Sequence, residues 1–350
     1  MTQPTLYSNV LVKIGAERGR LFSEAKLKAL TESKNLSELA AQLRDTSYQE
    51  QLAKASLPLT SRKIERAFNE NLISTYVKII RNSPKNASKY LRLYVLRFEV
   101  ENIKALIKTT NAKLSIDQKL SKIYLSVEDY LKNRPVIEET AKALTMQQLV
   151  KALRKTDYAS ALSSGLESYE EDGSTTCLDV LIDKTFYEKL HESYESLPEK
   201  EKPHAQFYAS IENDSFTLLT LLRGKNLNYD SNWLRLALPP NNFYLDAETV
   251  EAMVTAADFE SVLRIILESH YAGFFVKAIS PEEIVANAEK AFKKAILQHA
   301  KVSKIPESFN IGAALSLMIE KETEVHNLTA LGSAVEAEIK PEDIQRQLSL

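Results

Sequence analysis

Two short signatures each occur three times in this chain, in the same order and at nearly constant spacing. The first reads LAAQLRDTSY, LVKALRKTDY and VLRIILESHY and ends at Tyr48, Tyr158 and Tyr271. The second reads EVENIKAL, ENDSFTLL and EVHNLTAL and starts at Glu99, Glu212 and Glu324. Each glutamate follows its tyrosine by 51, 54 and 53 residues, respectively. A unit of about 112 residues is therefore repeated three times.

A repeat of this length is too long for a helical solenoid, whose units run to about 34–47 residues. Each repeat is long enough to form a small domain, and we place the domains at residues 1–115, 116–228 and 229–350. They either lie in a row or close around a pseudo-threefold axis. Closure would bring the first unit against the third, which suits a charge of +9 over residues 1–110 and −7 over residues 226–350. Ordinary solvated helix faces would give the same gradient.

The composition favours an all-α fold. The 350 residues include only 8 glycines and 11 prolines, too few for a protein built of tight β-turns. Apolar residues recur every four positions at Ile64, Phe68, Leu72 and Tyr76, which predicts a helix over 61–80. After the NSP break at 82–84, a single long helix is expected from about 84 to 108. Further helix starts are expected at Ser126 and Ser280, each followed three residues later by an acidic residue.

Small polar residues recur at one place on the apolar stripe of the repeated segment. Asn102 interrupts that stripe, and glutamates stand at its edge. One interpretation is a buried side chain that is hydrogen-bonded to a neighbouring helix. The other is a polar group that lines a central cavity. The recurring positions are Glu99, Asn102, Glu212, Ser215, Glu324 and Asn327.

No motif for catalysis, metal or cofactor binding is recognisable. GAERGR at 15–20 lacks the order of a phosphate-binding loop, and the five histidines include no pair at metal-ligand spacing. The basic side chains of the first unit are interspersed with glutamates, without a nucleic-acid-binding module. The single Cys177 excludes an intramolecular disulfide and fits a reducing cytosol. No apolar run is long enough to span a membrane, and no signal peptide is expected.

The paired signatures resemble a known family. LRDTSYQEQL, followed later in the chain by FEVENIKALIK, is similar to the C subunit of archaeal A-type ATP synthases and the d subunit of V-type ATPases. The opening YSNVLVKIGAERGRLFS is similar to the start of that family. The resemblance implies an all-helical funnel of three similar domains. It also implies a non-catalytic rotor subunit without cofactor, metal or nucleotide, whose torque links ATP chemistry to ion transport.

The same resemblance implies partners and a location. The partners would be the proteolipid ring of c/K subunits and the D and F subunits of the axle, with the membrane a/I subunit as a further neighbour and no nucleic acid. The chain would lie at the cytoplasmic face of the membrane, peripheral and held by the ring. The six recurring polar positions would then be candidates for facing the axle.

Two other classes stay open at this point. One is a helical scaffold or adaptor unrelated to rotary ATPases, and the other is a helical enzyme whose site has no familiar motif. The sequence does not distinguish ATP synthesis from ion pumping, or H⁺ from Na⁺.

Overall fold

The computed structural model describes residues 3–276, 278–302 and 309–348, and every regular element in these ranges is a helix. The all-α prediction is therefore confirmed. The chain divides into two compact units, unit 1 (residues 1–91 and 297–350) and unit 2 (residues 92–296). Unit 1 thus joins the two ends of the sequence. The three repeat boundaries and the funnel stay predictions.

Unit 1 contains two long helices, α5 and α19, with shorter helices around them. Its helices are α1 (Gln3–Arg18), α2 (Glu24–Leu30), α3 (Leu36–Gln42), α4 (Gln49–Ala53), α5 (Ser61–Asn82), α6 (Lys85–Leu91), α19 (Ile311–Glu336) and α20 (Pro341–Gln347).

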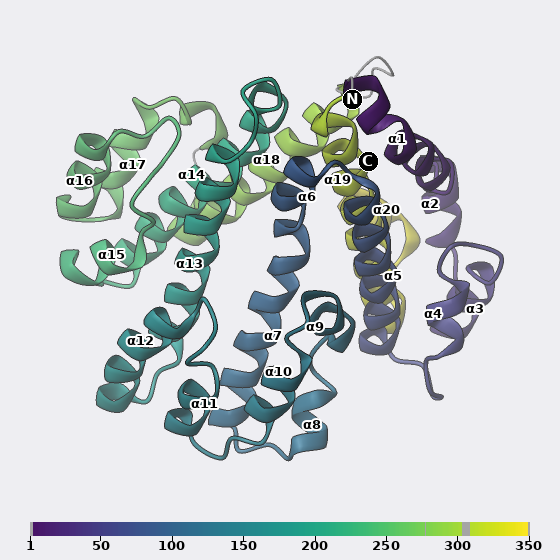
Figure 1. Cartoon of the computed structure of the whole chain (residues 1–350), viewed down its shortest axis with the longest axis horizontal. Helices are drawn as coiled ribbons and strands as arrows, with labels where there is room; N and C mark the ends of the chain where they lie inside the picture. Colours follow the sequence, from purple (N-terminus) through teal and green to yellow (C-terminus); the bar gives the residue numbers. More distant parts are fainter. Residues whose placement is uncertain (1–2, 277, 303–308, 349–350) are drawn as a thin grey trace. The chain divides into compact units, whose positions relative to one another are not determined.

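The core of unit 1 lies where α19 packs against α5, with α1 beside both (Figure 1). The apolar stripe predicted over 61–80 faces this core, since Ile64, Phe68, Leu72 and Tyr76 are all at most 3% exposed. First-repeat and third-repeat residues therefore pack together, which is the contact that the closure hypothesis requires.

Unit 2 contains the helices that follow α6, from α7 to α18. The last residues of α18 belong to unit 1. The helices are α7 (Leu93–Asn111), α8 (Ile116–Leu120), α9 (Leu125–Leu131), α10 (Arg134–Ala141), α11 (Met146–Ala152), α12 (Ala159–Asp172), α13 (Thr176–Glu195), α14 (Lys202–Asn226), α15 (Ser231–Ala237), α16 (Ala247–Thr255), α17 (Phe259–Leu267), the 3-10 helix η1 (Ala272–Phe274) and α18 (Pro281–Val302).

Helix α13 is central to the packing of unit 2 and contacts α7, α12 and α14 (Figure 1). Gly165 permits the close approach of α12 to α13, because a Cβ atom there would lie 2.8 Å from the Leu178 side chain. Helix α12 is followed at its C-terminal end by Gly173, whose positive φ of 71° suits glycine.

Two local predictions were wrong for identifiable reasons. The single helix expected over 84–108 is divided into α6 and α7 at Arg92. Five of the six residues 90–95 are buried, and one face of a straight helix cannot bury that many neighbours. Ser126 is not an N-cap, because α9 begins one residue earlier, after Tyr124. The predicted start at Ser280 is confirmed, with its hydroxyl accepting the Glu283 N–H at 3.3 Å.

Candidate functional site

The tyrosine signature forms the same local structure in all three repeats. A capped helix (α3, α11 or α17) begins after Asn35, Thr145 or Asp258, whose side chain accepts a backbone N–H of the first turn. The helix buries two aliphatic residues and is followed by a threonine or serine turn. In that turn the hydroxyl of Thr46, Thr156 or Ser269 donates to the carbonyl three residues earlier at 2.7 Å. It also accepts the N–H of the signature tyrosine at 3.2–3.4 Å.

Each signature tyrosine is buried and bonds to a carboxylate on a long helix of the preceding repeat. The Tyr158 hydroxyl donates to Glu99 Oε2 of α7 at 3.1 Å, and the Tyr271 hydroxyl donates to Asp214 Oδ2 of α14 at 2.7 Å. In unit 1 the Tyr48 hydroxyl donates to Glu324 Oε1 of α19 at 2.6 Å. We call these three contacts the tyrosine–carboxylate pairs. They connect repeats one and two, two and three, and three and one.

Each of these carboxylates also holds a second segment, which lies earlier in the same repeat as its tyrosine. Glu324 accepts the backbone N–H of Phe22, and Glu99 accepts the side-chain amide of Asn133. Asp214 accepts the backbone N–H groups of Phe243 and Tyr244 at 2.9 and 2.8 Å. One acidic side chain thereby fastens a long helix to two separate segments of the next repeat.

The structure corrects the alignment of the second repeat by two residues. Asp214, not Glu212, is equivalent to Glu99 and Glu324, and Thr217, not Ser215, stands at the position of Asn102. Glu212 instead forms an ion pair with Arg97, and the Ser215 hydroxyl donates to the Glu212 carbonyl at 3.2 Å. Both Glu212 and Ser215 are half-buried.

Burial separates the two registers, which apolar letters alone do not, because Phe216 and Leu219 of the first register are apolar as well. Under the corrected alignment Ile103, Leu218 and Leu328 coincide, as do Leu106, Leu221 and Leu331, and each of these is at most 1% exposed. The glutamate shared by positions 99, 212 and 324 favours the first register in the sequence. Apolar side chains report the core-facing side of a helix more reliably than one shared polar residue does.

Asn102 is an internal hydrogen-bonding residue that fixes the start of α9. The residue is 1% exposed; its Oδ1 accepts the Tyr124 N–H at 2.7 Å, and its Nδ2 donates to the Tyr124 carbonyl at 3.1 Å. Nδ2 also donates to Glu128 Oε1 at 2.7 Å. Asn327 is 2% exposed. The structure thus brings Asn102 and Glu99 into the interior of unit 2, and Asn327 and Glu324 into the interior of unit 1.

Burial determines the protonation of these groups. It raises the pKa of Tyr48, Tyr158 and Tyr271 well above the usual range, so each is a neutral donor. Burial also raises the pKa of Glu99, although hydrogen bonds from Asn133 and Tyr158 oppose that effect.

The pair in unit 1 differs because it includes a buried lysine. Lys321 Nζ donates to the Tyr48 hydroxyl at 2.7 Å and to Glu324 Oε1 at 2.8 Å, and it lies 4.0 Å from the centre of the Tyr48 ring. Burial lowers the pKa of Lys321, and the charge of Glu324 opposes this. The equivalent positions, three residues before the acid, are the aliphatic Leu96 and Ile211.

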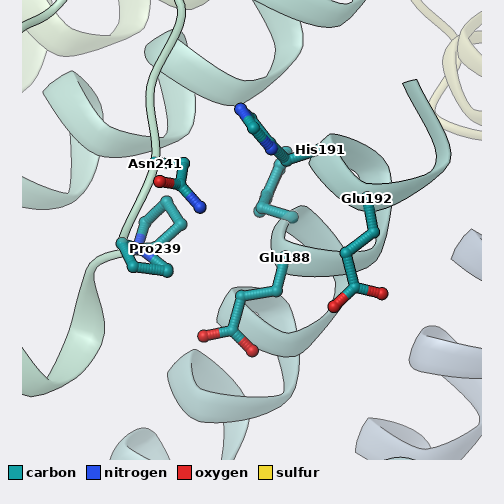
Figure 2. Close-up of a pocket in the computed structure, with 7 residues that line it drawn as sticks. Glu188, His191, Glu192, Pro239 and Asn241 are labelled. Atoms are coloured by element: carbon teal, nitrogen blue, oxygen red, sulfur yellow. The ribbon is translucent and has the colours of Figure 1, made fainter. Parts of the chain in front are cut away.

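A small pocket of about 120 Å³ lies in unit 2, and none of the residues that form the tyrosine–carboxylate pairs lines it. Glu188, His191 and Glu192 of α13 border it on one side and Pro239 and Asn241 on the other (Figure 2). Within the described ranges, no three His, Cys, Asp or Glu side chains are grouped to hold a metal ion. Among the same residues no helix is both long and apolar enough to cross a membrane.

Comparison with known proteins identifies the family. The sequence profile of the ATP synthase (C/AC39) subunit family matches residues 10–347. The chain belongs to this family. It is 27% identical to the C subunit of the A-type ATP synthase of Methanocaldococcus jannaschii over 348 residues, which cover 98% of this chain and 86% of that protein. The corresponding protein of Thermococcus kodakarensis is 26% identical, with 97% and 90% covered.

Both relatives are similar over most of their length, so the similarity extends well beyond one shared segment. The resemblance seen in LRDTSYQEQL and FEVENIKALIK is thereby confirmed. Those two segments contain Tyr48 and Glu99, which belong to two of the tyrosine–carboxylate pairs.

The corrected register predicts different effects for two acidic residues of α14. Asp214→Ala is expected to lower the free energy of unfolding by about 2 kcal/mol, because it leaves buried donors of Tyr271 and the 243–244 loop unsatisfied. Glu212→Ala breaks one ion pair and is expected to cost about 1 kcal/mol, because the Arg97 side chain that it leaves is 30% exposed and can be hydrated. Urea unfolding of both variants measures the difference, and equal losses would contradict the register.

Proposed function

We propose that this chain is a non-catalytic central-stalk subunit of a rotary A/V-type ATPase, coupling the D and F axle to the membrane proteolipid ring. The observation that carries the proposal is the family match over residues 10–347. The chain would lie peripherally at the cytoplasmic face of the membrane, held by the ring, with the a/I subunit as a neighbour. Its task would be to transmit torque during ATP-linked ion transport, with no catalytic site, cofactor or nucleotide of its own.

The internal construction supports this role on physical grounds. A part that transmits torque must resist deformation, so its long helices need connections that cannot slide. Each tyrosine–carboxylate pair fastens one long helix to a turn and to a loop of the next repeat. Buried, fully satisfied polar contacts rigidify a fold because they admit few alternative geometries.

A reconstitution experiment tests the coupling role. Vesicles are prepared with the complete ATPase or with the complex lacking this chain, and ATP hydrolysis and ion uptake are measured together. We expect omission of the chain to leave hydrolysis by the catalytic sector and to abolish ATP-driven ion uptake. Unchanged ion uptake without the chain would refute the proposal and favour an unrelated scaffold.

For the axle contact, we propose Glu212 and Ser215 from the six recurring positions. Both are partly exposed, although the Glu212 side chain is only 12% exposed and is paired with Arg97. Glu99, Asn102, Glu324 and Asn327 are at most 5% exposed, so a partner could reach them only after the interior had opened. These four would support the axle contact by holding the fold.

Substitutions separate these two roles. Asn102→Ala is expected to lower stability by about 2 kcal/mol, because the Tyr124 N–H loses its acceptor, while D–F affinity of the folded protein stays unchanged. Ser215→Lys is expected to weaken D–F binding about tenfold by adding a long charged side chain at the contact. Ser164→Lys, at an exposed serine of α12, is the control. Calorimetric titration with D–F measures all three, and equal affinities would exclude Ser215 from the contact.

A further inference from the structure

Helix α9 of unit 2 packs against α7, and polar contacts hold it there at both of its ends (Figure 1). At the start, Asn102 of α7 bonds to both backbone groups of Tyr124. At the end, Glu99 of α7 accepts the side-chain amide of Asn133, the second residue after the helix. A helix of seven residues is too short to be stable alone, so α9 depends on these contacts for its position.

The side chain of Glu128 is enclosed within this contact. The residue is fully buried, and its Oε1 accepts the side-chain amide of Asn102 at 2.7 Å. Its Oε2 is buried as well and has no hydrogen-bond partner among the residues that the structure describes. An ionised carboxylate in this position would lose its hydration without replacement, whereas a neutral carboxyl group loses much less. The geometry therefore favours the protonated form while α9 is closed on α7.

The electrostatic surroundings of Glu128 favour the same form. Burial raises the pKa of its carboxyl group to about 8, and the hydrogen bond from Asn102 opposes this effect. The charges of Glu99 on α7 and Asp129 on α9 raise the pKa further. The hydroxyl of Tyr158, which also bonds to Glu99, is buried and neutral. Ionisation of Glu128 would thus add a second buried negative charge beside Glu99.

The cations of this region act on other carboxylates, and none in the described ranges acts on Glu128. These cations and their carboxylates are Arg134 with Asp129 and Glu138, Lys142 with Glu139, and Arg92 and Lys189 with Glu99. The charged residues of α10, which packs on the other side of α9, are all included in these pairs. A negative charge on Glu128 would therefore meet no opposite charge while α9 stays closed.

The backbone at the C-terminal end of α9 favours opening. Lys132 follows the helix with a positive φ of 65°. This left-handed conformation costs energy in a residue that has a Cβ atom. The side chain of Lys132 is exposed, so it adds no buried packing that would offset the cost. The closed position is held by the polar contacts with α7 and by the buried apolar side chains of Ile123, Val127 and Leu131.

We propose that α9 is a latch controlled by one proton: it is closed on α7 while Glu128 is protonated, and it opens locally when Glu128 releases its proton to solvent. Opening carries the carboxylate into water and breaks the contacts of α7 with the segment 124–133. Because Glu99 also holds Tyr158, the latch connects the proton to one of the tyrosine–carboxylate pairs. The latch is a property of the free chain, so it holds or fails independently of the proposed function.

Hydrogen exchange of the folded full-length chain, followed by mass spectrometry, tests the latch. Exchange in the segment 124–133 is compared with exchange in α7 between about pH 5.5 and 8, after correction for the intrinsic rate of exchange. Each series is repeated at urea concentrations below the unfolding transition. The test variant is Glu128→Gln, which retains an acceptor for Asn102 and cannot ionise. The control is Glu139→Gln, which changes an exposed carboxylate of α10.

In wild type we expect the protection of the segment 124–133 to fall by up to about tenfold per pH unit as the pH approaches 8. Urea should have little effect on this exchange, because a local opening exposes little surface. Glu128→Gln should remove most of the fall with pH, and Glu139→Gln should retain it.

Three results would overturn the latch. The first is protection of the segment 124–133 that does not change with pH in wild type. The second is the same urea dependence for this segment as for α7, which would mean that α9 opens only when the whole unit unfolds. The third is an unchanged fall with pH in Glu128→Gln. The first two need wild type alone, so they decide the inference even if Glu128→Gln does not fold.

Discussion

Replacing Glu324 with alanine is expected to lower the free energy of unfolding by about 3–5 kcal/mol, which is typical when one partner of a buried ion pair is removed. The substitution leaves Lys321 as an uncompensated buried charge and takes the acceptor from the Tyr48 hydroxyl and the Phe22 N–H. It also removes one of the contacts between the N-terminal part of unit 1 and α19. Urea unfolding measures the loss, and hydrogen exchange should locate it around α3 and α19.

Two further variants make this prediction specific. Glu32→Ala removes an exposed carboxylate of unit 1 and is expected to change stability by less than about 0.5 kcal/mol. Adding Lys321→Leu to Glu324→Ala should recover part of the loss, because the stranded charge is gone and two repeats already have Leu96 and Ile211 at this position. A loss no larger than that of Glu32→Ala would show that the pair does not hold the ends together.

Glu128 is expected to make the stability of unit 2 fall as the pH rises from about 5 to 8. Burial raises the pKa of its carboxyl group to about 8 from 4.5. The hydrogen bond from Asn102 opposes this effect, and the charges of Glu99 and Asp129 make smaller contributions that raise the pKa further. The folded chain therefore holds a proton that the unfolded chain releases. The resulting stabilisation is full below pH 4.5 and is lost at up to about 1.4 kcal/mol per pH unit as the pH approaches 8.

Glu128→Gln isolates this effect, because its amide carbonyl can still accept the Asn102 hydrogen bond while the ionisable group is gone. We expect the variant to be more stable than wild type at pH 8, with a flatter stability curve between pH 5 and 8. Some slope should persist, since burial also raises the pKa of Glu99. Glu139→Gln, at an exposed residue of α10, should retain the wild-type slope. Parallel curves for Glu128→Gln and wild type would contradict a proton on Glu128.

Sequence patterns predicted those helices whose ends depend on local hydrogen bonds. The helix expected over 61–80 is α5, and the Ser280 start of α18 follows from a side chain and a backbone N–H three residues apart. The helix start predicted at Ser126 was wrong, because α9 begins after Tyr124. The backbone of Tyr124 is held by Asn102, which is 22 residues away in the sequence. The division at Arg92 likewise follows from packing on more than one side of the chain.

The sequence marked most residues of the candidate site, but it did not predict which of them bond to each other. Tyr48, Tyr158, Tyr271, Glu99 and Glu324 were all marked by recurrence, and all belong to the tyrosine–carboxylate pairs. Asp214 was missed because the sequence aligns Glu212, two residues earlier, with Glu99 and Glu324. Asp214 is the residue that occupies the equivalent position in the structure. No local rule states that a tyrosine meets the acid of the preceding repeat.

The sequence by itself determined that this chain is helical, that one long pattern occurs three times, and to which family the chain belongs. These properties depend on composition, on periodicity and on neighbours within a few turns. Only the tertiary structure decided that Tyr48 bonds to Glu324, 276 residues away, and that a lysine is buried beside them. Such contacts depend on which helices pack together, because a buried carboxylate bonds to whatever donors the packing brings within reach.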